Sequence, residues 1–399
     1  MDSVKYIGMD VHKEATTVAV LNASGKLVME SILETKAATI VQFLQGLRGE
    51  LHLTFEEGTW AAWLYDLVKP YVTKVVVCNP RKSALLQAGN QSDRMDARKL
   101  AELLRAGLLS GVYHGQTGLR TLKEWSRSYL TISKDLTRTM NRLKALYRSW
   151  SIPCAGPSLY APRHRAEWLS KITEAGVRRR AEWFYQQLDG LQRLRQAARH
   201  DLLAESRQHG AAKLLCQIPC IAAIRAALWI ALIQTPHRFR TQPPLWAYSG
   251  LALETHRSGE YRYVQGPLQR SHKPIELGGL HKNHNHDGKA IFKGAAVKAS
   301  TAGPFPEFYT TLLRKGMKPT MARLTVARKI ATITWMVWKK GVCFGAAQLK
   351  RPVSVGTSRP KESAPAAGIL PGDAPWDAGD VRVRGRVSTG SLGSVCFGS

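Results

Sequence analysis

Residues 6–21 read YIGMDVHKEATTVAVL and predict the first two strands of a sheet. The runs Tyr6–Met9 and Thr16–Leu21 are rich in apolar and β-branched residues, and the turn signal NASG follows the second run. Leu27–Ile32 is a plausible third strand. The chain is therefore predicted to open with antiparallel strands, and Asp10 lies at the end of the first one.

Strand-like and helix-like segments alternate over the rest of the first hundred residues. The pattern predicts, in order, a helix at 37–47, a strand at 51–55, a helix at 59–69, a strand at 74–78 and a helix at 92–105. An antiparallel opening followed by this alternation implies a mixed sheet with helices packed on it, which is an α/β fold. Such a sheet brings acidic residues that are far apart in the sequence to one edge.

The chain becomes mainly helical after the first domain, which we place at residues 1–117. Leu, Ala, Arg, Gln and Trp recur at helical spacing over residues 118–210, and SIPCAGP at 151–157 separates two long helices. This pattern predicts a helical hairpin or a coiled coil.

The third predicted domain covers residues 211–350 and is compact, mixed and mainly helical. Its helices are expected at 218–233, 245–249, 290–300, 306–315 and 320–338. Residues 351–399 are rich in Gly, Ser, Pro and Ala without periodicity, and we expect a disordered tail there.

The charge balance points to a polyanionic partner. The 399 residues include 58 Lys and Arg against 29 Asp and Glu, a net charge of +29. A globular protein this basic repels itself unless it meets a polyanion, so nucleic acid is the first candidate partner. A very soluble protein with a ribosome-like charge bias is the alternative, because charge alone does not identify a ligand.

Neither a zinc site nor a membrane segment is expected. Of the six cysteines only Cys216 and Cys220 are close in sequence, and no second pair stands at a zinc-binding spacing. The N-terminus lacks the apolar run of a signal peptide, and the most hydrophobic segment, Ile218–Ile233, is too short to span a bilayer. We expect a cytoplasmic protein, associated with the nucleoid in a bacterium.

Carboxylates are scarce in this chain, so their positions are informative. Asp10 and Glu56 lie at the ends of two predicted strands, and Asp93 and Asp96 lie three residues apart at the start of a helix. Hard divalent cations prefer such oxygen ligands, and convergence of like charges is favourable mainly with a metal present. Judged singly, each acid could instead be a solvated strand end or a first-turn residue that favours the helix dipole.

The order and setting of these acids resemble the RuvC-like branch of the RNase H fold. Further motifs resemble the DEDD transposases of bacterial insertion sequences, the bridge-RNA-guided serine recombinases. The motifs that carry the resemblance are IGMD (7–10), EEG (56–58), NP (79–80), SDRMDA (92–97), IPCI (218–221), RFR (238–240), LWAYSGL (245–251) and THRSGE (255–260). They run in the family's order from about Tyr6 to Phe344.

The resemblance implies a RuvC-like domain, a coiled-coil domain and a C-terminal transposase domain. It implies Mg²⁺ at Asp10, Glu56, Asp93 and Asp96. It also implies that Ser258 attacks a DNA phosphodiester and holds the strand as a phosphoserine. The implied partners are donor and target DNA, a structured noncoding guide RNA and further copies of the chain, as a dimer or tetramer.

Some residues allow two interpretations. Glu57 is the alternative to Glu56, and Cys220 replaces the family's glycine. The stretch from His281 to Asp287 could hold a transition metal, although capping a helix or contacting phosphate is the simpler role. Cations that could hold DNA phosphates, or be solvated surface, are Lys282, Lys289, Lys293, Arg257 and Arg262. Tryptophans that we expect in the core are Trp60, Trp63, Trp229 and Trp246.

Two other functions compete with an RNA-guided DNA transposase/recombinase. The first is a metal-only RuvC-like nuclease, such as a junction resolvase, which would not use Ser258 as a nucleophile. The second is a nucleic-acid-binding protein whose acidic site is inactive.

Overall fold

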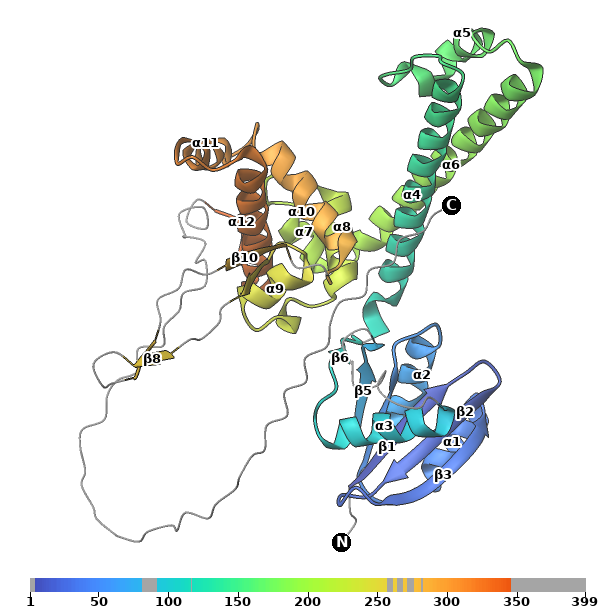
Figure 1. Ribbon diagram of the computed structural model, residues 1–399, viewed down its shortest axis with the longest axis vertical. Coiled ribbons are helices and arrows are strands. Elements are labelled where there is room, and N and C mark those ends of the chain that lie inside the picture. Colours follow the sequence, from blue (N-terminus) through green and yellow to red (C-terminus); the bar gives the residue numbers. More distant parts are fainter. Residues whose placement is uncertain are drawn as a thin grey trace, which may run out of the picture. The chain divides into compact units, whose positions relative to one another are not determined.

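A computed structural model describes residues 4–80, 92–115, 117–256, 261–263, 268–270, 276–280 and 283–345 (Figure 1). The first part of the chain forms a mixed six-stranded sheet with the strand order β3-β2-β1-β4-β5-β6. The strands are β1 (Lys5–Val11), β2 (Ala15–Leu21), β3 (Leu27–Glu34), β4 (Leu51–Glu56), β5 (Lys74–Cys78) and β6 (Gly111–Val112). The predicted tail at 351–399 lies outside the described residues.

The pairing of these strands confirms the predicted antiparallel opening. β1 pairs antiparallel with β2, and β2 pairs antiparallel with β3. β4 then pairs parallel with β1, and β5 pairs parallel with β4. Met9 of β1 lies opposite Phe55 of β4, so the next residues along each strand, Asp10 and Glu56, follow at the same end of the sheet. Every predicted strand up to residue 78 is present within two residues of its expected ends.

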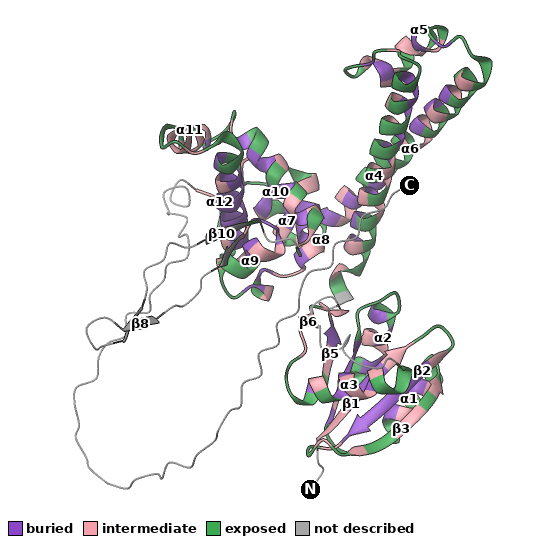
Figure 2. Ribbon diagram, in the orientation of Figure 1, coloured by how far each residue is buried: buried purple, intermediate pink, exposed green. Residues whose placement is uncertain are grey.

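Helices cover both faces of the sheet. The side chains of Ile7 and Met9 belong to a buried cluster with residues of α1 (Ala37–Gln45) and α2 (Ala61–Val68). Gly8 alternates with them along the pleated strand and therefore faces the opposite side, where α3 (Asp93–Arg105) packs. Figure 2 shows the buried residues of β1 and β2 between these layers.

Gly8 is the point of closest approach between α3 and the sheet. A Cβ atom at this position would lie 2.1 Å from the carbonyl oxygen of Ala97 and 2.6 Å from the backbone nitrogen of Ala101. Both neighbours are helix backbone, which cannot move aside as a flexible side chain can. Only glycine allows α3 to lie this close to β1, so this residue determines how near the start of α3 comes to the end of β1.

Two long helices form the middle of the chain, as the sequence predicts. α4 (Arg120–Ser149) and α6 (Ala175–Arg207) pack along each other, with α5 (Arg165–Ser170) in the connection. At the connection the Tyr185 hydroxyl donates to the Leu159 carbonyl, and Arg165 makes two hydrogen bonds with Asp189. The paired guanidinium holds the pKa of Asp189 below its usual range.

The last part is built around the buried helix α12 (Pro319–Lys340), which is largely purple in Figure 2. α12 packs against α10 (His286–Ala299) and α11 (Pro306–Arg314). The same core includes residues of three shorter helices, α7 (Gly210–Leu215), α8 (Ala223–Ile233) and α9 (Gln242–Tyr248). Buried residues near the start of α4 and the end of α6 also join this core.

Two predictions for this part are wrong in detail. The helix expected from Ile218 begins only at Ala223, because Pro219 cannot donate a helical hydrogen bond and Cys220 has a positive φ of 70°. The segment after α9 also holds strands that the sequence did not indicate. These are β7 (Leu253–His256), β8 (Tyr261–Tyr263), β9 (Leu268–Arg270) and β10 (Glu276–Leu280).

Helices that could cross a membrane are absent from the part of the chain that the structure describes, because none combines the necessary length with a sufficiently apolar sequence.

Candidate active site

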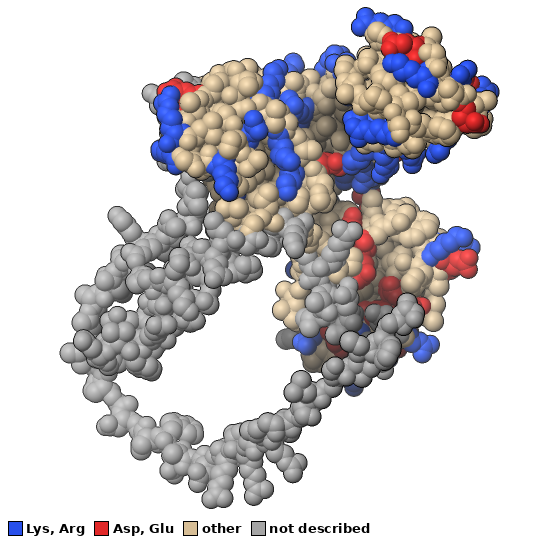
Figure 3. All heavy atoms as spheres, turned by 45° about the horizontal axis from the view of Figure 1, so that its top comes forward, with Lys and Arg blue, Asp and Glu red and all other residues tan. Residues whose placement is uncertain are grey.

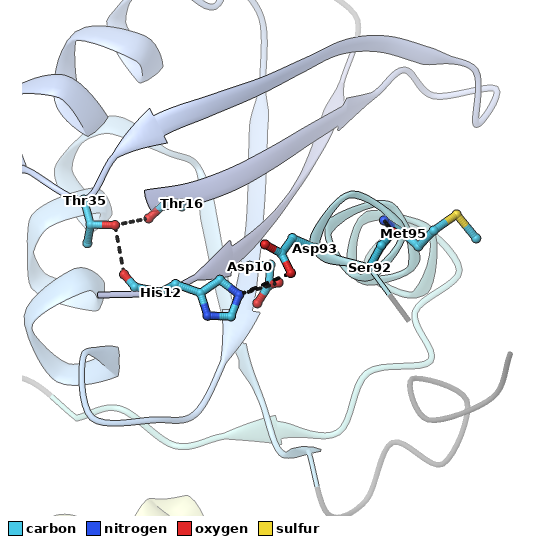
Figure 4. Close-up of polar contacts among 7 residues, drawn as sticks. All are labelled: Asp10, His12, Thr16, Thr35, Ser92, Asp93 and Met95. Carbon is cyan, nitrogen blue, oxygen red and sulfur yellow. Dashed lines mark hydrogen bonds and ion pairs between the residues drawn. The ribbon is translucent and has the colours of Figure 1, made fainter. Parts of the chain in front are cut away.

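Carboxylates from three elements converge at one end of the sheet. Asp10 is near the end of β1 and Glu56 is the last residue of β4. Asp93 and Asp96 lie in the first turn of α3, whose start approaches β1 because of Gly8. Ser92 caps this helix by accepting a hydrogen bond of 3.4 Å from the backbone N–H of Met95 (Figure 4). The first turn of α3 is thus fixed in direction, and its acids also benefit from the helix dipole.

The pKa values of two of these acids, Asp10 and Glu56, are raised by burial and by neighbouring negative charge. Burial raises the pKa of Asp10, and the negative charges of Asp93 and Asp96 raise it further, while His12 opposes the shift. Loss of water around the carboxyl raises the pKa of Glu56, and the charges of Asp10 and Asp96 add to this effect. Asp10 and Glu56 therefore both sense neighbouring negative charge, and such convergence is unfavourable without a compensating cation.

The donor set fits a hard divalent cation. Asp10, His12 and Asp93 each offer one ligand atom, and these three atoms lie within 4.8 Å of one another. This is the group of metal-ligating side chains that stands out among the described residues. Glu56 and Asp96 lie outside this tightest group but act electrostatically on Asp10 or on each other. Carboxylate oxygens in such number are typical of Mg²⁺ and Mn²⁺ sites.

Comparison with known proteins identifies the domains of this chain. The DEDD transposase domain of the IS110 type, described as "Transposase", matches residues 7–150. A second domain, described as "Transposase IS116/IS110/IS902 family", matches residues 212–275. The chain carries IS110-family transposase domains. Both domains belong to transposases, which are enzymes that act on DNA.

A curated relative agrees with this assignment. The chain is 25% identical over 174 residues to the "Transposase for insertion sequence element IS1533" of Leptospira borgpetersenii. The matched segment makes up 42% of this chain and 50% of the relative, so the chain spans about half the length of the relative that it matches. The six-stranded mixed sheet is consistent with a RuvC-like transposase domain, and Asp10, Glu56, Asp93 and Asp96 all fall within the matched DEDD range.

Glu57, the second acid of the EEG motif, has a different partner from Glu56. Its Oε2 lies 2.7 Å from Nε2 of His114, and the His114 ring stacks on Tyr65 with ring centroids 4.9 Å apart. Glu57 is thereby occupied away from the other acids. The charges of Asp10 and Asp96 act instead on Glu56, which supports Glu56 as the site residue.

Cys78 lies beside this site and is chemically quiet. It is the last residue of β5 and pairs with Glu56 across the parallel strands. Burial raises the pKa of its thiol to about 12, and the charge of Glu56 adds to the shift. A thiol held in its neutral form is a poor nucleophile and a poor ligand for a hard cation, so Cys78 acts as a packing residue.

His12 belongs to the site, although the sequence motifs did not indicate it. Its Nε2 lies 3.1 Å from Oδ2 of Asp10 and 3.6 Å from Oδ1 of Asp93 (Figure 4). The available signal was its position two residues after Asp10, in the short turn between two predicted strands. A side chain in such a turn cannot be far from the strand end.

Ser258, which the resemblance implies as the nucleophile, lies outside the described residues. It falls within the second matched range of 212–275, two residues after β7 ends at His256. The structure likewise gives no side-chain position for Arg257, Arg262 or Lys282, which we considered as phosphate contacts.

The histidine-rich stretch from His281 to Asp287 contributes a helix cap. Asn285 caps α10 by accepting a 2.7 Å hydrogen bond from the Gly288 N–H. His284 lies 3.4 Å from the Lys289 amine, and neither it nor His286 joins a metal-ligating group among the described residues. The capping role that we considered simpler is therefore present.

The prediction for the tryptophans is half wrong. Trp229 and Trp246 are buried, as expected for core residues. Trp60 and Trp63 are 41% and 37% exposed and contact each other edge to face. They flank the start of α2, a short helix whose buried face is supplied by Ala61, Leu64 and Val68. The helix is present as predicted, but helical spacing alone does not determine which face is buried.

Proposed function

We propose that this protein is an RNA-guided DNA transposase/recombinase that cuts and rejoins the strands of an insertion sequence. The observation that carries the proposal is the convergence of Asp10, Asp93 and His12 in a DEDD transposase domain, with Glu56 and Asp96 close enough to perturb the same site. The second transposase domain, which includes Ser258, supports recombination rather than simple cleavage. Because the curated relative is matched over half of its length, the activity of the whole protein is part of the proposal.

The four carboxylates would hold Mg²⁺. When bound, a divalent cation there neutralises charge that develops on the oxygens of a phosphodiester. Asp10 and Glu56 are fixed by paired strands, and Asp93 and Asp96 by a capped helix, so the ligands come from rigid elements. This rigidity keeps the site assembled in spite of the repulsion between its acids.

Ser258 would be the nucleophile. Its Oγ forms a bond to phosphorus while the bond from phosphorus to one deoxyribose oxygen breaks, and that oxygen takes up a proton. The strand is then held as a phosphoserine diester. A hydroxyl of the partner strand next attacks phosphorus and releases Ser258, so the strands are rejoined without ATP because the bond energy is conserved.

The positive charge of the chain supports long nucleic-acid partners. Lys and Arg side chains are spread over the helical segments in Figure 3, whereas the part that holds the sheet shows Asp and Glu beside Lys and Arg in that view. Cations on the helical segments would neutralise DNA phosphates and a structured noncoding RNA, and RNA pairing would then supply sequence choice. We also propose that copies of the chain assemble as a dimer or tetramer.

One experiment tests the chemistry. Supercoiled DNA that carries the element ends is incubated with the protein, its copurified RNA and Mg²⁺, and recombinant strands and covalent protein–DNA adducts are counted. We expect Asp10→Ala to lower strand exchange on the order of 10³-fold while DNA binding is retained. Ser258→Ala should abolish the adduct. Asp135→Ala is the control, because Asp135 is an acid on α4 that pairs with Arg138 and does not belong to the site.

Three results would contradict parts of the proposal. Full strand exchange by Ser258→Ala, with no adduct in the unmodified protein, would favour a metal-only nuclease of the RuvC-like type. Unchanged cleavage in Asp10→Ala would remove the metal site from the mechanism. Random cellular RNA among the sequenced copurifying RNA would contradict guidance by a dedicated RNA.

A further inference from the structure

His12 occupies a defined position beside the acids. It follows directly after β1, and its side chain points back toward the end of that strand (Figure 4). Its Nε2 is 3.1 Å from Asp10 and 3.6 Å from Asp93, and both contacts are to carboxylate oxygens. A single imidazole nitrogen is thus directed at two oxygens from different elements of the fold.

The backbone of His12 is held by neighbouring strands. The Thr35 hydroxyl donates a 2.9 Å hydrogen bond to the His12 carbonyl, and the His12 N–H donates to the Ala15 carbonyl at 3.0 Å. The Thr35 hydroxyl is also 2.9 Å from that of Thr16, which is fully buried. The hydroxyl chain ties the turn to β2 and to the end of β3, so the backbone that carries the imidazole is held in place beside the acids.

The distances suit a shared metal ion. Ligands on adjacent corners of an octahedron with bonds of about 2.1 Å lie about 3.0 Å apart. The separations from Nε2 to the two oxygens, 3.1 Å and 3.6 Å, are near this value. Small side-chain movements would bring all three atoms onto one cation, and His12 is 56% exposed, so its ring is free to adjust.

We propose that His12 is an imidazole ligand of the carboxylate centre and makes this centre prefer Mn²⁺ to Mg²⁺. The inference rests on the proposed metal site and adds the identity of the cation. Mg²⁺ has a strong preference for oxygen, whereas imidazole raises the affinity of a site for first-row transition metals. Mn²⁺ accepts carboxylates and octahedral geometry as Mg²⁺ does, so the same site serves both ions with different affinities.

A simple ion pair is the competing explanation. A protonated His12 between Asp10 and Asp93 would offset part of their repulsion without ever binding a metal. In that case a cation would displace the imidazole rather than bind it. The two explanations predict opposite effects of a metal on the environment of the His12 nitrogen, so a spectroscopic measurement separates them.

The test uses the full-length protein and Mn²⁺ alone, without DNA. Mn²⁺ affinity is measured by electron paramagnetic resonance of the free ion, and competition with Mg²⁺ gives the selectivity. Pulsed measurements on the bound ion detect modulation from a coordinated ¹⁴N nucleus. We expect that modulation in the unmodified protein and its loss in His12→Ala. The variant should also bind Mn²⁺ about tenfold more weakly, with a much smaller change for Mg²⁺.

His200→Ala is the matched control. His200 is an exposed residue of α6 whose Nδ1 lies 3.3 Å from Asp201, so it is a histidine–carboxylate pair outside the sheet domain. Its replacement should leave the ¹⁴N signal and the selectivity unchanged. A circular dichroism spectrum of His12→Ala that matches the unmodified protein shows that the turn change has not unfolded the sheet.

The outcomes distinguish this inference from the proposed function. Bound Mn²⁺ without ¹⁴N modulation, and with the same selectivity in His12→Ala, would overturn the ligand role while the carboxylate site and the transposase activity remain. Absence of any bound divalent ion in the unmodified protein would overturn both. Strand exchange that is lost in Asp10→Ala, together with the expected modulation, would support both.

Discussion

The sheet domain and helix α12 both concentrate charge, but they compensate it in different ways. At the acidic edge of the sheet, burial raises the pKa of Asp10 and Glu56, and the negative charges of neighbouring acids add to both shifts. On α12, Arg328 and Lys329 are 8% and 7% exposed, and burial lowers the pKa of each. One region gathers anions at an edge, and the other places cations in a core.

Neutral groups contact the two cations, although Nη2 of Arg328 is buried without a hydrogen-bond partner among the described residues. Nε of Arg328 donates a 2.5 Å hydrogen bond to the Leu251 carbonyl, and the Lys329 amine lies 4.1 Å from the centre of the Phe308 ring. Among the acids, Asp96 has the Lys99 amine 3.6 Å away, whereas Asp10 and Asp93 contact the imidazole of His12. These two regions show how charges that stabilise a core differ from charges that form a ligand site. Buried charges that find local partners belong to the architecture, whereas like charges held together by rigid elements indicate a ligand.

Gly8→Ala should displace α3, which carries two of the acids, and destabilise the protein more than any other substitution considered. The added methyl group would collide with the backbone of α3 at Ala97 and Ala101, so we expect a loss of about 3 kcal/mol in the free energy of unfolding. Divalent-ion affinity should fall as well, because α3 carries Asp93 and Asp96. Calorimetry and Mn²⁺ titration measure the two effects.

Gly190→Ala provides the control for this substitution. Gly190 lies inside α6, and a Cβ atom there would have nothing within 4 Å. Alanine should stabilise this helix by up to about 1 kcal/mol and leave metal binding unchanged. Equal melting temperatures for Gly8→Ala and the unmodified protein would contradict the close approach of α3 to β1.

Arg328→Ala removes one of the two buried cations of α12 and should lower the free energy of unfolding somewhat less than Gly8→Ala. The change removes the hydrogen bond to the buried Leu251 carbonyl and leaves a cavity in the C-terminal core, so we expect a loss of about 2 kcal/mol. Lys329→Met, one residue further on α12, keeps a similar volume against Phe308 and should change stability by less than about 1 kcal/mol. A larger loss of stability in Lys329→Met than in Arg328→Ala would show that the contact of Lys329 with Phe308 stabilises the core more than the hydrogen bond of Arg328.

Asp10→Asn should slightly stabilise the protein when no metal is bound, although it removes a residue of the site. The pKa of Asp10 is raised in the folded chain, so its stabilising contribution is present below the unfolded value and is lost as pH rises through the folded value. At neutral pH without metal the ionised carboxylate therefore opposes folding. Asp10→Asn should raise the melting temperature by about 2 °C in a chelating buffer.

Addition of a divalent cation should reverse this order. Binding stabilises the folded form of the unmodified protein, whereas Asp10→Asn has lost a ligand and gains little. Differential scanning fluorimetry with chelator and with Mg²⁺ measures both arms at pH 7. If Asp10→Asn melts at a lower temperature than the unmodified protein in chelator, the ionised Asp10 carboxylate does not destabilise the fold.

Much of the sheet domain could be predicted from the sequence, and the reasons are local. Val75, Val76 and Val77 are β-branched, and β5 begins and ends at the predicted residues, Lys74 and Cys78. The sequence predicts a helix at 92–105, and α3 covers Asp93–Arg105 with Ser92 as its cap. Carboxylates at the ends of neighbouring strands must meet at one edge, so the setting of Asp10 and Glu56 followed from the order of strands.

The remaining features depend on contacts that sequence spacing does not encode. The exclusion of any side chain at Gly8 is visible only when α3 lies on β1. The turn that holds His12 beside the site is bound by the hydroxyl of Thr35, which directly follows β3. Trp60 and Trp63 repeat with helical period, yet the three apolar residues on the other face of α2 fill the core. The late start of α8 follows from the positive φ of Cys220, which the family's glycine would adopt without strain.

The parallel pairing of β1 with β4 has a consequence for the assembly of the domain during folding. Met9 lies opposite Phe55, and side chains alternate between the two faces of a sheet. If β4 shifted by a single residue, Glu56 would move to the face opposite Asp10 and the ligands would separate. A divalent ion held by these acids would therefore favour the native strand register, because only that register keeps Asp10 and Glu56 on the same face. Metal binding during refolding would therefore report when β1 and β4 reach their native pairing.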